Sequence, residues 1–267
     1  MLMDHIGEFF PDSPIWFRWL GRLAAPLFFY ALAVGFQHTR NRKKYLLRLY
    51  LANVGMVFFN QIMCMLQRKL DYVAYQPKNH NIFTTLFCAG VLICIWENRK
   101  EKKKFFTYIG IYIFWQAMVM GLAILAEAFD YVWRGNALLQ TVLRTNYIFP
   151  LLGGIWDAEG GVFFIVLGIW LYCAVENKWK LALRYILFCG AYMFMCQGDI
   201  LYRIMSRFSF WGYHKLADVI YFGSSFVGIP LGTSDLSLLT EFYQWMMIGA
   251  LPIMLSCNGK RGKSLKW

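Results

Sequence analysis

Seven long apolar runs constrain this chain more than any other feature of its sequence. A helix needs about 20 mostly apolar residues to cross a bilayer. Six runs are 16 to 22 residues long, enough for a membrane span or most of one, and a 14-residue run needs neighbouring residues to reach that length. We therefore expect an all-α fold, a polytopic transmembrane bundle of about eight segments in one domain over residues 1–267. The runs without Asp, Glu, Lys or Arg are Leu23–Thr39, Leu49–Gln67, Asn79–Trp96, Phe105–Ala126, Gly160–Val175, Tyr185–Gly198 and Phe242–Gly259.

The composition supports a membrane protein and excludes several other classes. Hydrophobic residues make up 59% of the chain, and its mean hydropathy is +0.43. Charged residues make up 16%, against about 25% in an ordinary soluble domain. This balance excludes a soluble enzyme, a disordered tail and a disulfide scaffold. The seven cysteines lie mostly within apolar runs without a Cys-x-x-Cys pair, so we expect free thiols and no metal site.

The net charge of +12 falls in short clusters between the apolar runs, which indicates membrane topology rather than nucleic-acid binding. Residues 39–44, 97–104, 176–184 and 258–267 together hold 16 Lys and Arg residues. The alternating segments 67–81, 130–147 and 201–215 hold 8. Cytoplasmic loops are richer in Lys and Arg. The pattern therefore predicts a multi-pass protein of the cell membrane, in contact with its lipids, with a cytoplasmic C-terminus.

Two apolar stretches do not resemble complete spans. Leu216–Gly232 is interrupted by glycines and a proline, and counting it as a crossing would place the basic tail outside. We expect a re-entrant or surface-lying segment there, with Ser234 or Asp235 capping the final helix. Residues 148–156 are also too short for a span, and we expect a partly buried loop.

Ionisable side chains within apolar sequence mark either a function or a satisfied pair. Asp4 and His5 end a short apolar stretch, and a carboxylate beside an imidazole can raise its basicity for general-base chemistry. An Asp–Arg pair between helices, with a hydrogen-bonded histidine, explains the same residues. Arg22 either extends toward the outer face or fixes a carbonyl or carboxylate in a cavity.

A second polar cluster closes the first complete apolar run, over His38–Lys44. Fixed cations beside a helix end suit a phosphate-bearing cofactor such as a nucleotide or coenzyme A. A positive-inside anchor, or contact with anionic lipid, explains the lysines equally well. Elsewhere, His80 and His214 are expected in solvated loops. Asp157 and Glu159 could line an external pocket or cap the next span, and capping or pairing explains Glu127, Asp199 and Glu241.

Several ordered motifs resemble the TraX-type membrane proteins, a family named for the acetylase that modifies the N-terminus of conjugative pilin. The resemblance spans nearly the whole chain and is strongest in the first fifty residues. The motifs are Asp4-His5-Ile6-Gly7, Gly21-Arg22-Leu23-Ala24-x-Pro26-Leu27-Phe28, Gly35-Phe36-x-His38-Thr39-Arg40-Asn41, Lys44-Tyr45-Leu46-Leu47-Arg48-Leu49, Asn81-Ile82-Phe83-Thr84-Thr85-Leu86, Asp157-x-x-Gly160-Gly161-Val162 and Asn258-Gly259-Lys260-Arg261-Gly262.

The resemblance implies a polytopic helical acyltransferase that uses acetyl-CoA as co-substrate and an amine or hydroxyl as acceptor. His5 would be the base or acyl relay, and Asp4 and His38 would complete the catalytic group. The residues expected to bind acetyl-CoA or the acceptor are Arg22, Arg40, Arg42, Lys43, Lys44, Arg48, Asn81 and Asp157.

The chain departs from the family pattern at its two ends and in its third span. Members carry about a dozen residues before the Asp-His pair, and they continue past the Asn-Gly-Lys-Arg-Gly motif into a helix with a Pro-x-His motif. Here Asp4 is close to Met1, and Trp267 ends the chain. We therefore expect a naturally short or truncated member. The third span also lacks the proline usually found near its outer end.

Two other functions remain open from the sequence. Polar residues in a helix bundle can line a solute path, which would make the protein a transporter. The same residues could serve only packing in a non-catalytic assembly factor for a surface appendage. For an acetyltransferase, the pilin N-terminus, a glycan, a lipid or a cell-wall amine are all compatible acceptors.

Overall fold

The computed structural model describes residues 14–69, 81–133, 147–156, 158–233, 236–237, 241–242 and 244–257. These residues are mainly helical and include no strand. The expected all-α fold is therefore confirmed. The elements in chain order are α2 (Trp16–His38), α3 (Arg42–Lys69), α4 (Ile82–Glu97), η1 (Asn98–Lys100), α5 (Lys102–Trp133), α7 (Phe149–Leu151), α8 (Gly161–Tyr172), α9 (Lys178–Gln197), α10 (Ile200–Phe210), α11 (His214–Val227), η3 (Gln244–Gly249) and α12 (Ala250–Ser256).

Four described helical stretches are long and apolar enough to cross a membrane: Trp16–His38, Ile82–Lys100, Lys102–Ala126 and Lys178–Phe210. Two shorter apolar helices cover Gly161–Tyr172 and Gln244–Ser256. The membrane-protein class is thus supported by length and composition, and the total of about eight segments stays a prediction.

Exposed apolar side chains on α5 point to a lipid environment. Phe106 and Phe114 are each 67% exposed, and Ile111 and Ile113 are similarly open. Large exposed apolar surfaces of this kind mark a membrane or protein interface. A water-soluble helix would instead bury one apolar stripe and expose polar residues.

The chain divides into two compact units. Unit 1 comprises Met1–His38, Leu167–Asp218 and Pro230–Trp267, and unit 2 comprises Thr39–Val166 and Val219–Ile229. Helices α8 and α11 each contribute residues to both units.

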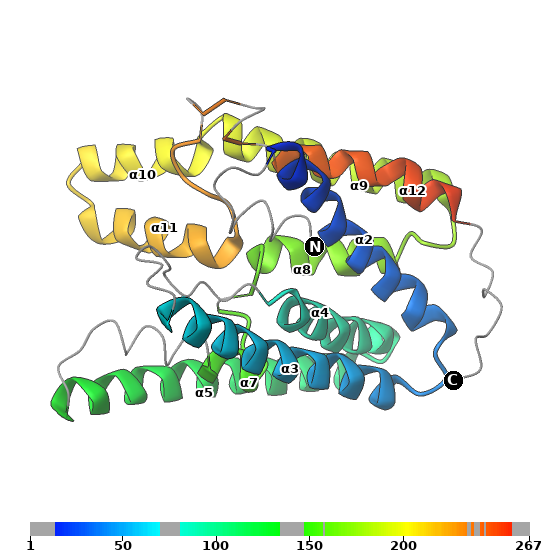
Figure 1. Ribbon diagram of the computed structural model, residues 1–267, viewed down its shortest axis with the longest axis horizontal. Coiled ribbons are helices and arrows are strands. Elements are labelled where there is room, and N and C mark those ends of the chain that lie inside the picture. Colours follow the sequence, from blue (N-terminus) through cyan, green and yellow to red (C-terminus); the bar gives the residue numbers. More distant parts are fainter. Residues whose placement is uncertain are drawn as a thin grey trace. The chain divides into compact units, whose positions relative to one another are not determined.

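In unit 2, α3 and α4 pack against each other over much of their length, and α5 runs beside α4 (Figure 1). The start of α3 pairs with the end of α4, whereas Asn53 in α3 contacts Thr84 in the first turn of α4. The two helices are therefore antiparallel. The expected loop at 148–156 contains one helical turn, α7, whose Phe149 and Pro150 are buried.

In unit 1, α12 packs against both α2 and α9 (Figure 1). Helix α9 begins at an N-cap, where the Asn177 side chain accepts hydrogen bonds from the backbone N–H groups of Trp179 and Lys180. It ends at Gln197 with Gly198 as its C-cap, and Asp199, whose backbone is left-handed (φ 46°), is the N-cap position of α10. The Asp199 carboxylate accepts a hydrogen bond from the backbone N–H of Thr233, so it serves as a pairing group.

Two expectations need correction. The final apolar run does not form one helix, because the 3-10 turn η3 precedes a short α12. The N-cap position of α12 is Gly249, so neither Ser234 nor Asp235, which lie outside the described residues, caps it. Residues 216–227 form most of α11, and in the turn that follows Gly228 and Gly232 have positive φ.

Candidate functional site

A pocket of about 230 Å³ lies in unit 1, where the end of α2, the turn before α9 and the end of α12 meet. Its side chains combine an imidazole, a carboxylate, an amine, a thiol and a phenol with an apolar lining. The lining residues are Tyr30, Val34, Gln37, His38, Val175, Glu176, Lys178, Leu181, Met254 and Cys257. The pocket therefore brings together segments that are far apart in the sequence.

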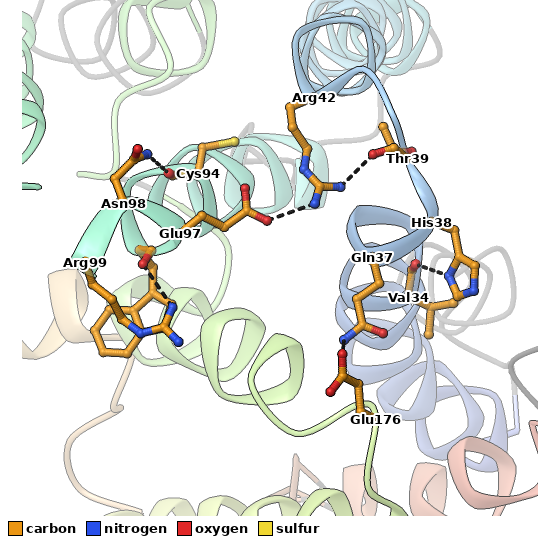
Figure 2. A network of polar contacts seen from close by, with 11 residues as sticks. Val34, Gln37, His38, Thr39, Arg42, Cys94, Glu97, Asn98, Arg99 and Glu176 are labelled. Atoms are coloured by element: carbon orange, nitrogen blue, oxygen red, sulfur yellow. Dashed lines mark hydrogen bonds and ion pairs between the residues drawn. The ribbon is translucent and has the colours of Figure 1, made fainter. Parts of the chain in front are cut away.

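His38 is the predicted catalytic residue that this pocket contains. It ends α2 and is exposed, and its Nδ1 lies 2.9 Å from the backbone oxygen of Val34 (Figure 2). A carbonyl oxygen can only accept a hydrogen bond, so Nδ1 carries a proton in this contact. In the neutral ring, Nε2 then holds the lone pair. This is the tautomer that a general base needs, with Nε2 open to accept a proton.

Two contacts fix the walls of the pocket beside His38. Gln37 Nε2 donates to Glu176 Oε1 at 3.5 Å, which joins α2 to the turn before α9 (Figure 2). Lys178 Nζ donates to the backbone oxygen of Leu255 at 2.7 Å, which joins α9 to α12. These contacts place one carboxylate and one ammonium group at the rim of the pocket.

Arg22 lies deeper in unit 1 and is partly buried. Its Nη1 donates to Gln244 Oε1 at 3.0 Å. Of the two interpretations of Arg22, this contact fits a cation that fixes a carbonyl oxygen, here supplied by the protein itself. A role toward a substrate stays a prediction.

The basic residues after His38 have different surroundings. Arg42 donates from Nη2 to Glu97 Oε1 and from Nη1 to the backbone oxygen of Thr39, both at 2.9 Å (Figure 2). Its guanidinium group therefore holds the turn before α3 against the end of α4. The side chains of Arg40, Lys43, Lys44 and Arg48 are exposed, and no described residue pairs with them.

Asn81 is buried in unit 2 at the start of α4. Its Nδ2 donates to Asn53 Oδ1 at 2.6 Å and to the Asn53 backbone oxygen at 3.2 Å. The structure thus places Asn81 in helix packing, and its predicted substrate contact has no further support. Asp4, His5 and Asp157 lie outside the described residues, and their roles stay predictions.

Other sequence predictions can be compared with the described residues. His214 is exposed, as expected, but it is the first residue of α11 and not part of a loop. The six described cysteines are free thiols: Cys88, Cys189 and Cys196 are buried, Cys94 is partly buried, and Cys173 and Cys257 are exposed. Within the described residues, no group of three His, Cys, Asp or Glu side chains could hold a metal ion.

The sequence analysis missed most of the pocket. Lys178 was counted only among the Lys and Arg residues of segment 176–184, Glu176 was not considered, and Cys257 was only one of the seven cysteines. One signal was available, because each lies at a junction between an apolar run and a basic segment, as His38 does. Their convergence depends on contacts across 139 and 77 residues, which no local pattern encodes.

Comparison with known proteins adds one finding. The family described as TraX protein matches residues 1–213, which is more than half of the chain and includes His38, Glu176 and Lys178. No curated protein and no solved structure matches the chain.

Proposed function

Because the chain belongs to the TraX family, we propose that it is a membrane acetyltransferase that moves an acetyl group from acetyl-CoA to an amine or hydroxyl acceptor. The family is linked to pilin acetylation, and membership suggests a conjugation-related membrane protein. A pilin N-terminus, or an amine or hydroxyl of a glycan or lipid in the cell envelope, has the required chemistry.

The observation that carries this proposal is the position of the His38 imidazole at the pocket, with Nδ1 2.9 Å from the Val34 backbone oxygen and Nε2 on the other side of the ring. Nε2 accepts the proton of the acceptor as its nitrogen or oxygen bonds the acetyl carbonyl carbon. The carbon–sulfur bond of the thioester then breaks, and the imidazolium returns the proton to the sulfur of coenzyme A. A positioned base of this kind contributes about 10²–10⁴-fold in rate.

The donor's phosphates would bind the exposed cations that follow His38. Arg40, Lys43 and Lys44 are within six residues of His38 in the chain, so even an extended backbone keeps them within about 20 Å of it. Their side chains have no partner among the described residues, which suits them to an incoming polyanion. Arg42 instead holds the turn before α3, which contains Arg40, against the end of α4.

Asp4 and His5 keep the roles that the family resemblance implies. His5 is the alternative base, or an acyl carrier, and Asp4 would orient it. The experiment must therefore separate His38 from His5, because loss of either base would reduce the same reaction.

The test measures coenzyme A release and labelled acetyl transfer by the purified full chain in detergent. We expect His38→Ala to lower the rate by about 10²–10⁴-fold. His214→Ala is the matched control, because His214 is also exposed at a helix end but does not line the pocket. Full activity in His38→Ala, with loss only in His5→Ala, would assign the base to His5 and overturn this role for His38.

We also propose a cell-membrane location with the pocket and C-terminus on the cytoplasmic side. Three of the four segments with the most basic residues directly adjoin or contain residues of the pocket, at His38, Glu176 and Cys257. A membrane-impermeant maleimide should label Cys257 in inverted vesicles but not in right-side-out vesicles. A Cys257→Ser chain identifies the label, and the opposite pattern would reverse the orientation.

A further inference from the structure

Two basic segments far apart in the sequence lie at the same end of unit 2. The 2.9 Å ion pair between Arg42 and Glu97 joins the first turn of α3 to the last turn of α4 (Figure 2). Helix η1 continues directly from α4, and α5 packs back against both. The basic residues that begin α3 are therefore on the same end as those of η1 and the first turn of α5. We call this end the basic end of unit 2.

The charges of the basic end are strongly unbalanced. Its two carboxylates are already paired, Glu97 with Arg42 and Glu101 with Lys104 at 2.7 Å. Seven further cations have no carboxylate partner among the described residues, and all seven are exposed. They are Lys43, Lys44, Arg48, Arg99, Lys100, Lys102 and Lys103. Like charges at this density repel one another, so an anionic partner would relieve the repulsion.

Aromatic side chains place these cations at the level of a membrane surface. The Arg99 guanidinium lies 5.3 Å from the centre of the Trp96 ring, and its Nη1 donates to the Trp96 backbone oxygen. Trp96, Phe106 and Tyr108 are exposed, and the exposed apolar face of α5 follows them. Trp and Tyr concentrate where the hydrocarbon meets the headgroups. The adjacent cations then lie at the depth of lipid phosphates.

We propose that the basic end of unit 2 binds the headgroups of anionic phospholipids. Its centre is the group Arg99, Lys100, Lys102 and Lys103, which the predicted acetyl-CoA residues do not include. Lipid is favoured over a soluble phosphate because these cations directly adjoin exposed aromatic and aliphatic side chains. A phospholipid can contact both the cations and the apolar side chains, with its phosphate against the cations and its acyl chains along α5.

The test uses the full chain with phosphatidylglycerol or phosphatidylcholine in mixed micelles and counts bound lipid by native mass spectrometry. We expect the triple variant Lys100→Gln, Lys102→Gln and Lys103→Gln to lose phosphatidylglycerol binding several-fold. Phosphatidylcholine binding should not change. The matched control removes three exposed cations elsewhere, through Arg203→Gln, Arg207→Gln and Lys215→Gln. Equal loss in both triple variants would mean a response to total charge and would overturn the proposal.

A second measurement separates the lipid from the acetyl donor. The Lys100, Lys102 and Lys103 variant should keep the KM for acetyl-CoA, whereas replacing Arg40, Lys43 and Lys44 by Gln should raise it. If the first variant raises KM and keeps its lipid, the basic end binds the donor's phosphates, and the proposal is wrong. Lipid binding is measured without acetyl transfer, so failure of the proposed function leaves this test intact.

Discussion

Four side chains from α3 and α5 in unit 2 turn inward and bond backbone, whereas the imidazole of the unit 1 pocket remains exposed. In unit 2, four consecutive carbonyl groups after the start of α7 each receive a side-chain donor. Asn53 donates to Pro150, Tyr50 to Leu151, Trp115 to Leu152 and Gln116 to Gly153, at 2.6 to 3.1 Å. In unit 1, His38 makes one backbone contact and is otherwise exposed.

The difference follows from what each region must satisfy. The chain around 150–156 leaves helical geometry, and non-helical backbone in apolar surroundings needs hydrogen-bond partners. Helices α3 and α5 supply those partners from residues within otherwise apolar runs. The pocket of unit 1 lies at helix ends, where side chains can remain available to a ligand. A polar residue in an apolar run can therefore either bond non-helical backbone or remain available to a ligand. Its hydrogen-bond partners in the structure show which of the two it does.

The largest stability effect should come from Asn53→Ala. Asn53 is fully buried, and its amide bonds Asn81, Thr84 and Pro150. Removing it leaves several buried polar groups without a partner, at about 1–3 kcal/mol each. We expect the free energy of unfolding in detergent to fall by about 3 kcal/mol or more. Thr107→Ala, at an exposed hydroxyl of α5, should have little effect, and equal losses in the two variants would contradict the comparison.

The next largest effect should come from Gly161→Ala, which should lower the free energy of unfolding by about 3 kcal/mol. Gly161 has φ +61°, and an added Cβ would lie 2.4 Å from the backbone nitrogen of Gly228. The left-handed conformation disfavours alanine, and the contact requires a backbone shift. Gly110→Ala in α5 is the control, because its Cβ would meet nothing within 4 Å and alanine favours helix. The Gly110 variant should unfold at the same temperature as the unchanged chain or at a higher one. A Gly161 variant that is as stable as the unchanged chain would show that the turn can shift to accept the added Cβ, and it would contradict this prediction.

The sequence predicted the helical class because charge-free apolar runs leave few alternatives in a membrane. It placed Asp199 just after the end of an apolar run, but it did not predict helix α10 in the segment expected to be a loop, or the 3-10 start of the last helical run. His38 was predicted because the family resemblance covers it, and it lies in a polar cluster that also holds several cations. Asn53 was not, since its partners are 28 to 97 residues away.

The Arg42–Glu97 ion pair should contribute less to the stability of the fold. Both side chains are 30% exposed, so solvent screens their attraction. A double-mutant cycle with Arg42→Gln and Glu97→Gln should give a coupling of about 0.5–1 kcal/mol. The more exposed Lys104–Glu101 pair should give a weaker coupling in the same assay. A coupling of several kcal/mol would mean that solvent does not screen this pair, and it would contradict the ranking.

The smallest stability effect should come from His38→Ala, the variant with the largest expected effect on activity. His38 is exposed, and its one described hydrogen bond goes to a carbonyl of its own helix. Surface substitutions of this kind usually change stability by about 0.5 kcal/mol or less. Measuring unfolding and acetyl transfer on the same preparation separates the two roles. A His38→Ala chain that loses as much stability as Asn53→Ala would make His38 a packing residue, and the contrast between the two units would fail.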